Sequence, residues 1–336
     1  MITVSHLTKY YGGHLAVNDL SFEIDEGHVY GFLGPNGAGK STTMNIMTGC
    51  LSATEGTITI DGYDIFDQPK QAKKQIGYLP EQPPLYINES PVDYLRFVGE
   101  AKGLRGDTLH TQIEEVIRQI GIEHVCNRRI GTLSKGYKQR VGIAQALLGN
   151  PKVIILDEPT VGLDPIQIIE IRDLIRDLGK THTVIFSSHV LSEVQTICDR
   201  ILMIAHGKLV AFDETGNLEK QLLSNGEINI TTDADTLALE ALLANVNCLT
   251  EFSVQKVSSG YSSAYIKTEH NDIYAVSSEI FHACAEHNIT LFEMSLKKAN
   301  LEDVFLELAG GDTVELDNSD KKTHDEERQK GEVNEV

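Results

Sequence analysis

The pattern of apolar and polar residues divides the chain into stretches that favour strands and stretches that favour helices. Apolar and polar residues alternate at 2–6 and 20–25, which predicts two antiparallel strands near the start of the chain. Continuous apolar runs then occur at 28–33, 153–156, 183–186 and 200–204. Such runs are typical of strands that are buried on both faces of a sheet. Because amphipathic helical stretches separate the last three runs, the pattern predicts an α/β fold with a mostly parallel sheet.

Two regions depart from this alternation of strands and helices. Between about 85 and 150, apolar residues recur at helical spacing, which predicts an inserted helical subdomain. Beyond residue 217 the expected order is strand, helix, strand, strand, helix, strand, which is the order of a ferredoxin-like unit. An amphipathic helix is expected at 300–308. The expected parts are a large α/β domain at 1–217, a small α+β domain at 218–310 and a disordered acidic tail at 311–336.

Composition and charge narrow the classes of partner. The 336 residues carry a formal net charge of −20 and no large cluster of Lys or Arg, so we expect no binding of nucleic acid. No apolar run approaches the ~18–20 residues needed to span a bilayer. Any association with a membrane is therefore expected to run through another protein. The five cysteines lie far apart, which argues against a zinc site or a disulfide framework.

A glycine-rich segment follows the apolar run at 28–33 and fits the pattern G-x-x-x-x-G-K-[ST], a phosphate-binding loop. Glycines allow successive backbone N–H groups to turn toward one anion, and the following helix points its positive end at the same place. Lys40 can reach the β- and γ-phosphates of a nucleotide, and the Ser41 hydroxyl can bind Mg²⁺. The nucleotide-binding residues expected from this loop are Gly34, Pro35, Asn36, Gly37, Ala38, Gly39, Lys40, Ser41 and Thr42.

Two carboxylates, Asp157 and Glu158, follow the buried run at 153–156. In parallel α/β sheets this end of a strand is where ligands bind. Asp157 is placed to hold Mg²⁺, directly or through water. Glu158 is placed to accept a proton from the water that attacks the γ-phosphate, or to orient that water. The alternative is an ordinary acidic turn before a proline. It is the less favoured interpretation because a phosphate loop precedes this segment in the chain.

The segment Leu133-Ser134-Lys135-Gly136-Tyr137 precedes an apolar helical stretch, and Ser134 can cap that helix. The order of phosphate loop, this segment, Asp-Glu and a later histidine resembles the ATP-binding subunit of an ABC transporter. In that family the segment is the signature motif LSGGQ. Here Lys135 and Tyr137 depart from the motif, in a form similar to subfamilies that pair with ABC-2-type membrane subunits and act in multidrug export. The resemblance implies that Ser134 and Gly136 contact the γ-phosphate of ATP held by the other subunit of a head-to-tail dimer.

Further positions between 1 and about 215 match the same family. Asp164 resembles the D-loop residue that crosses the dimer interface, and His189 resembles the switch histidine that contacts the γ-phosphate. Tyr11 matches the aromatic residue that stacks on adenine, with Tyr10 as its near rival and a buried core Tyr as the alternative. The family places a glutamine that touches Mg²⁺ after the strand expected at 76–80. Here Glu81 falls on that place and Gln82 follows it, and the sequence leaves both open.

The resemblance implies a P-loop NTPase core of the ABC ATPase kind, with an N-terminal antiparallel β subdomain and a helical insertion. It implies an ATPase that uses ATP and Mg²⁺ and closes as a homodimer, although a heterodimer with another ATPase subunit stays open. Its partners would be integral membrane subunits of the ABC-2 type, and it would lie at the cytoplasmic face of the membrane and drive export. The alternative is a soluble ABC ATPase with a regulatory role or one linked to nucleic acid or ribosomes. The transported substrate stays open.

Overall fold

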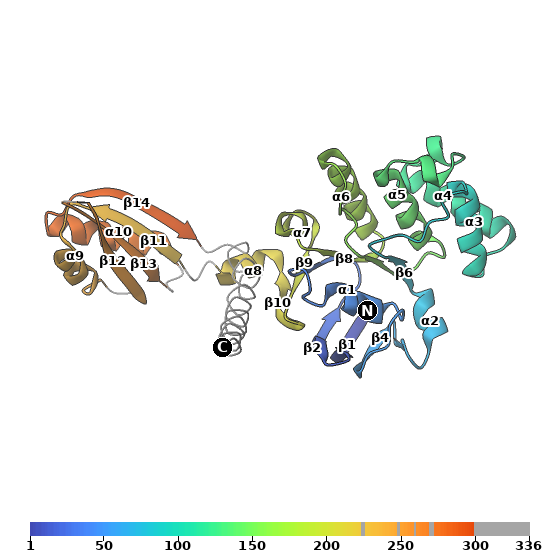
Figure 1. The fold of residues 1–336 in the computed structure, drawn as a ribbon, viewed down its shortest axis with the longest axis horizontal. Coiled ribbons are helices and arrows are strands. Elements are labelled where there is room, and N and C mark those ends of the chain that lie inside the picture. Colours follow the sequence, from blue (N-terminus) through green and yellow to red (C-terminus); the bar gives the residue numbers. More distant parts are fainter. Residues whose placement is uncertain (223–225, 247–248, 259, 269–271, 299–336) are drawn as a thin grey trace, which may run out of the picture. The chain divides into compact units, whose positions relative to one another are not determined.

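Six strands form the central sheet of the first part of the chain (Figure 1), in the order β10-β9-β3-β8-β7-β6. From β9 to β6 all neighbours run parallel, and only β10 is antiparallel to its neighbour. Every residue of β3 and β7 is buried, as continuous apolar runs predict for strands covered on both faces. The strands are β3 (Val29–Leu33), β6 (Ile76–Leu79), β7 (Val153–Leu156), β8 (Thr183–Ser188), β9 (Arg200–Ala205) and β10 (Lys208–Glu214).

The structure, a computed structural model, describes residues 1–222, 226–246, 249–258, 260–268 and 272–298. The chain divides into two units, Met1–Thr215 and Gly216–Val336. The helix expected at 300–308 and the tail expected at 311–336 lie outside the described residues. None of the helices within the described residues combines the length and apolar character that crossing a membrane requires.

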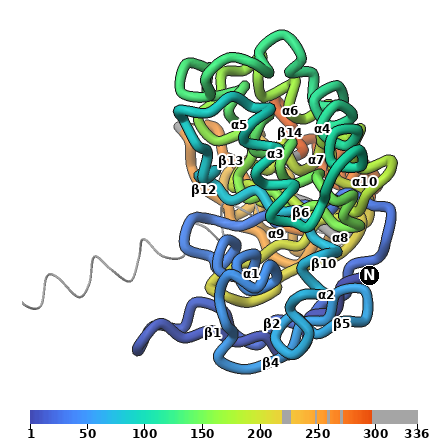
Figure 2. The backbone as a smooth tube through the Cα atoms, turned by 90° about the vertical axis from the view of Figure 1, so that its right-hand side faces the viewer, coloured from blue at the N-terminus to red at the C-terminus, as the bar shows by residue number. Residues whose placement is uncertain are grey.

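A second sheet in the first unit is antiparallel, with the order β2-β1-β4-β5. Its strands are β1 (Ile2–Tyr11), β2 (His14–Ile24), β4 (Glu55–Ile60) and β5 (Tyr63–Asp64). Helix α1 (Lys40–Met47) packs between the two sheets (Figure 2), and its buried residues join one apolar core with residues of both. Both β1 and β2 are longer than the alternating pattern predicts. The register between them shifts three times along β1, and each shift interrupts the alternation that marks a strand in the sequence.

Three helices form the predicted helical subdomain, which lies above the edge of the central sheet in the view of Figure 2. They are α3 (Pro91–Ala101), α4 (Gly106–Ile120) and α5 (Lys135–Leu147), with short 3₁₀ turns at Glu123–Val125 and Ile130–Thr132. Helix α5 packs against both β6 and β7 as well as against α3 and α4, so it joins the insertion to the sheet. The remaining helices of this unit are α2 (Pro69–Lys74), α6 (Pro165–Gly179) and α7 (Leu191–Ile197), and α8 (Thr215–Leu222) spans the boundary between the units.

The second unit contains a four-stranded antiparallel sheet in the order β12-β13-β11-β14. Along the chain the elements are β11 (Gly226–Thr232), α9 (Thr236–Leu243), β12 (Glu251–Ser258), β13 (Tyr261–Thr268), α10 (Ile273–Glu286) and β14 (Leu291–Lys298). This is the element order expected of a ferredoxin-like unit. Alternate residues such as Ile228 and Ile266 pack with both helices into a separate core. The other face is polar, where the Tyr265 hydroxyl donates a hydrogen bond to Glu227.

Candidate nucleotide-binding site

The phosphate loop lies between β3 and α1, at the carboxyl end of a central strand. Its glycines are required by backbone geometry. Gly37 and Gly39 have φ angles of 83° and 103°, in the left-handed region that favours glycine. A Cβ at Gly39 would lie 2.6 Å from the carbonyl oxygen of Ala16, and a Cβ at Gly34 would lie 2.3 Å from that of Ile204. Because the loop passes so close to neighbouring backbone at Gly34 and Gly39, only glycine fits at these two positions.

Lys40 is the first residue of α1 and is only 5% exposed. Its Nζ donates hydrogen bonds to the carbonyl oxygens of Gly34 at 2.8 Å and Pro35 at 3.2 Å, and lies 3.6 Å from Oε1 of Glu158. Burial lowers the pKa of Lys40, while the negative charge of Glu158 partly opposes that shift. A phosphate in the loop would give this buried ammonium a further anionic partner.

Asp157 follows β7 and is 2% exposed. Its Oδ1 accepts hydrogen bonds from the Ser187 hydroxyl at 2.6 Å and from the Ser41 hydroxyl at 3.1 Å. The structure therefore brings together two of the residues predicted to bind Mg²⁺. Carboxylate and hydroxyl oxygens are hard donors of the kind that Mg²⁺ prefers, so this pair fits the ion. Ser187 was not predicted, because a serine at the end of an apolar strand carries no motif.

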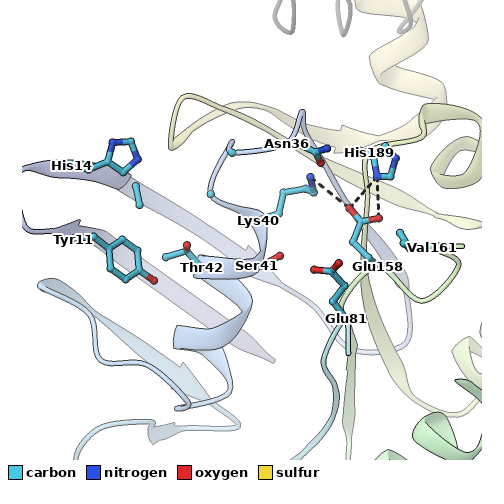
Figure 3. Close-up of a pocket in the computed structure, with 13 residues that line it drawn as sticks. Tyr11, His14, Asn36, Lys40, Ser41, Thr42, Glu81, Glu158, Val161 and His189 are labelled. Carbon is cyan, nitrogen blue, oxygen red and sulfur yellow. Dashed lines mark hydrogen bonds and ion pairs between the residues drawn. The ribbon is translucent and has the colours of Figure 1, made fainter. Parts of the chain in front are cut away.

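Glu158 is 8% exposed and lies between two basic side chains (Figure 3). Lys40 is on one side of its carboxylate. On the other, Nδ1 of His189 lies 3.1 Å from Oε2 and 3.3 Å from Oε1. The backbone N–H of Glu158 donates to the Ser187 hydroxyl at 2.8 Å, and its φ angle is 47°. The carboxylate is thus fixed at the edge of the phosphate loop, where it can accept a proton.

A cavity of about 410 Å³ opens beside these groups (Figure 3). Its lining residues are Tyr11, His14, Ala16, Asn36, Gly37, Gly39, Lys40, Ser41, Thr42, Glu81, Glu158, Val161 and His189. Tyr11 is 49% exposed, which excludes the alternative of a buried core tyrosine, and Tyr10 is not part of the lining. His14 pairs with Tyr11 across the strands and was not predicted, because no motif marks it.

Glu81 and Gln82, the two positions left open by the sequence, differ in the structure. Glu81 lines the cavity and points its carboxylate toward the space beside Ser41 and Glu158 (Figure 3), whereas Gln82 does not line it. A third carboxylate therefore faces the place where Mg²⁺ is expected.

The predicted residues Ser134, Gly136 and Asp164 line a separate cavity of about 230 Å³. Ser134 caps α5 and accepts from the N–H of Tyr137 at 3.4 Å, and Asp164 caps α6. A Cβ at Gly136 would lie 2.8 Å from the side chain of Gln167. None of the three lines the first cavity. The predicted site residues thus form two groups, one around the phosphate loop and one around the signature segment.

Comparisons with known proteins agree with this arrangement. A family model described as ABC transporter matches residues 17–161. The chain is 34% identical over 308 residues to the uncharacterized ABC transporter ATP-binding protein YxlF of Bacillus subtilis, covering 92% of this chain and 99% of YxlF. It is 33% identical over 316 residues to the bacitracin transport ATP-binding protein BcrA of Bacillus licheniformis, covering 94% and 99%. A solved dimer of the ATP-binding cassette MJ0796, in a post-hydrolysis state with ADP and Pi, matches with a TM-score of 0.58 and 26% identity over 64% of this chain and 99% of that one.

Proposed function

Because the chain belongs to the ABC transporter ATP-binding proteins, we propose that it binds and hydrolyses ATP to drive export through separate membrane subunits. The observation that carries this proposal is the fixed carboxylate of Glu158 between Lys40 and His189, at the edge of a phosphate loop. The relative BcrA is a bacitracin transport ATP-binding protein, which supports the movement of a substrate. The alternative of a nucleic-acid or ribosome-linked ATPase is disfavoured by the net charge of −20.

In the proposed reaction the loop and Lys40 hold the β- and γ-phosphates of ATP. Tyr11, which is exposed at the rim of the cavity, stacks on the adenine. Glu158 accepts a hydrogen bond or proton from the attacking water, and His189 contacts the γ-phosphate from the same side. In this proposal one chain supplies all the groups just described, which contact the nucleotide from one side. Ser134, Gly136 and Asp164 of a second copy complete the site, because they lie apart from the loop in one chain.

For Mg²⁺ we propose Ser41, Asp157 and Glu81 as the groups that hold the ion, directly or through water. Replacing Glu81 with Gln is expected to raise the Mg²⁺ concentration for half-maximal ATPase activity about three- to tenfold, because one negative charge beside the ion is lost. Titrating Mg²⁺ at saturating ATP measures this shift. The control is Gln82→Ala, which should leave the Mg²⁺ dependence unchanged. Equal shifts in both variants, or a shift only in Gln82→Ala, would reject Glu81.

We further propose that an ABC-2-type permease docks on an exposed apolar patch that follows Glu81 along the chain, which would hold the protein at the cytoplasmic face of the membrane. The patch consists of Tyr86, Ile87 and Phe97, which are 49%, 59% and 52% exposed. The ring of Tyr86 packs against that of Phe97 at 5.2 Å and against the buried Tyr94 at 5.7 Å. An exposed apolar patch on a fixed base is typical of a protein-binding surface.

Placing a charge in this patch tests the docking. Phe97→Asp is expected to reduce co-purification with the permease at least tenfold, while the chain without its partner keeps its ATP affinity. Pull-down from solubilised membranes measures the first quantity, and binding of a fluorescent ATP analogue measures the second. Phe281→Asp provides the matched control, since Phe281 is 53% exposed on α10 in the other unit. If Phe97→Asp co-purifies with the permease as the wild type does, the permease docks on a different surface.

A further inference from the structure

Three carboxylates are buried among the residues that the structure describes. Two of them, Asp157 and Glu158, belong to the nucleotide site. The third is Glu193 in α7, which is 4% exposed and does not line either cavity described above. A buried carboxylate costs stability unless hydrogen bonds or opposite charges compensate it, so its partners indicate what it does.

One oxygen of Glu193 joins two segments that flank the reactive groups, the loop after β7 and the end of β8. Its Oε2 accepts a hydrogen bond from the Thr160 hydroxyl at 2.8 Å and another from the Ser188 hydroxyl at 2.9 Å. Thr160 lies two residues after Glu158, and Ser188 immediately precedes His189. The segments that carry the proton acceptor and the histidine are therefore held by the same atom.

The hydroxyl groups in this cluster have few alternatives. Thr160 is 5% exposed and Ser188 is 1% exposed, so neither can turn to bulk water. The Ser188 hydroxyl also accepts from the backbone N–H of Val190 at 3.0 Å, which fixes the chain on the far side of His189. Removing the carboxylate would leave two buried hydroxyl donors without their acceptor, and both segments would have to rearrange.

The other oxygen of Glu193 faces helix α6. Its Oε1 lies 3.5 Å from the guanidinium of Arg172, which is two turns along the helix that Asp164 caps. Nε of Arg172 is buried and finds no hydrogen-bond partner within the described part of the chain. The charge on Glu193 is therefore balanced from α6, while both hydroxyl contacts are made through Oε2. The same carboxylate connects the loops around the nucleotide to the helix behind the predicted dimer contact.

We propose that Glu193 is a positioning residue that keeps His189 within hydrogen-bond reach of Glu158. The proposal rests on the ATPase function proposed above. Glu193 touches neither the phosphate loop nor the cavity, so it acts on hydrolysis and not on nucleotide binding. Misplacement of a reacting group by about 1 Å can cost about 10²-fold in rate. A loss of both hydroxyl contacts is therefore expected to appear in kcat.

The test compares Glu193→Ala, Glu193→Gln and Thr160→Val in the full chain. Glu193→Ala should lower kcat for ATP about 10- to 100-fold, with KM changed less than about threefold. Glu193→Gln keeps an oxygen that can accept from both hydroxyls, so it should recover kcat to within about threefold of wild type. Thr160→Val keeps the shape of the side chain and removes one hydroxyl, so it should lower kcat about three- to tenfold without loss of folding.

Two further measurements separate positioning from general damage. In a His189→Ala background, adding Glu193→Ala should lower kcat by clearly less than it does in the wild-type background, since one of the two groups held by Glu193 is gone. The control is Asp61→Asn, which removes the ion pair between Asp61 and Lys152. Neither residue lines the nucleotide cavity or contacts Glu193, so kcat should be unchanged. Unchanged kcat in Glu193→Ala and Thr160→Val, or a full additional loss in the double variant, would overturn the proposal. Failure of the ATPase function itself would appear differently, as absence of hydrolysis in the wild-type chain.

Discussion

Replacing Glu158 with Gln is expected to lower ATP hydrolysis about 10³-fold while ATP still binds with nearly wild-type affinity. The amide keeps the size of the side chain but cannot accept a proton from water. The groups proposed to hold the phosphates, the loop and Lys40, are unchanged. Because hydrolysis is the step that ends the ATP-bound state, the variant should accumulate with ATP as a dimer. Steady-state ATPase assays and light scattering with and without ATP measure both effects.

Two comparisons make this result specific. Glu115→Gln carries the same chemical change at an exposed position of α4 and should hydrolyse ATP as the wild type does. Loss of Lys40 is expected to abolish nucleotide binding together with hydrolysis, so it should yield no ATP-dependent dimer. A Glu158→Gln variant that keeps full activity would remove Glu158 from its proposed role. One that loses ATP binding as well would place it among the binding groups.

Mixing two inactive variants should restore part of the activity. Lys40→Ala disables the phosphate loop, and Ser134→Glu places a negative charge where a phosphate of the other subunit is expected. Each variant should be inactive by itself, because each would spoil both sites of a symmetric dimer. In a mixed dimer, the intact loop of one chain faces the intact signature segment of the other, and one complete site remains.

The expected recovery follows from counting sites. If equal amounts pair at random and sites act independently, about a quarter of wild-type activity should return on mixing. The separation of the two cavities within one chain is the structural reason for this expectation. ATPase assays after co-refolding or co-expression measure the recovered activity. The control is Lys40→Ala alone, treated in the same way at the same total protein concentration. No recovery at any mixing ratio would contradict the shared site.

Sequence spacing predicted the elements that depend on local chemistry. Buried parallel strands such as β7 are continuous apolar runs, and the turn from β3 into α1 can be formed only by a glycine-rich loop. The boundaries of β1 and β2 could not be predicted in the same way, because their register shifts break the alternation of side chains. Strand β10 was missed because it is an edge strand whose residues are exposed or only half-buried, so no apolar run marks it.

The same division holds for the site residues. Lys40, Asp157 and Glu158 belong to short motifs, and spacing along the chain locates them. Ser187 and Glu193 act through contacts with residues about thirty positions away, such as the bond from Thr160 to Glu193. Contacts of that kind depend on which strands are neighbours in the sheet. The sequence pattern predicts a parallel sheet but does not specify that β7 and β8 are adjacent.

The backbone at Glu158 has an evolutionary consequence. A φ of 47° is unfavourable for a residue with a side chain by about 1–2 kcal/mol, and glycine or asparagine adopts it at lower cost. Selection for folding would therefore tend to remove the glutamate from this position. A duplicated copy released from the need to hydrolyse ATP should drift toward glycine or asparagine here while its core stays intact. A glutamate kept at this position despite its strained backbone should therefore distinguish copies that still hydrolyse ATP from copies that have lost the activity.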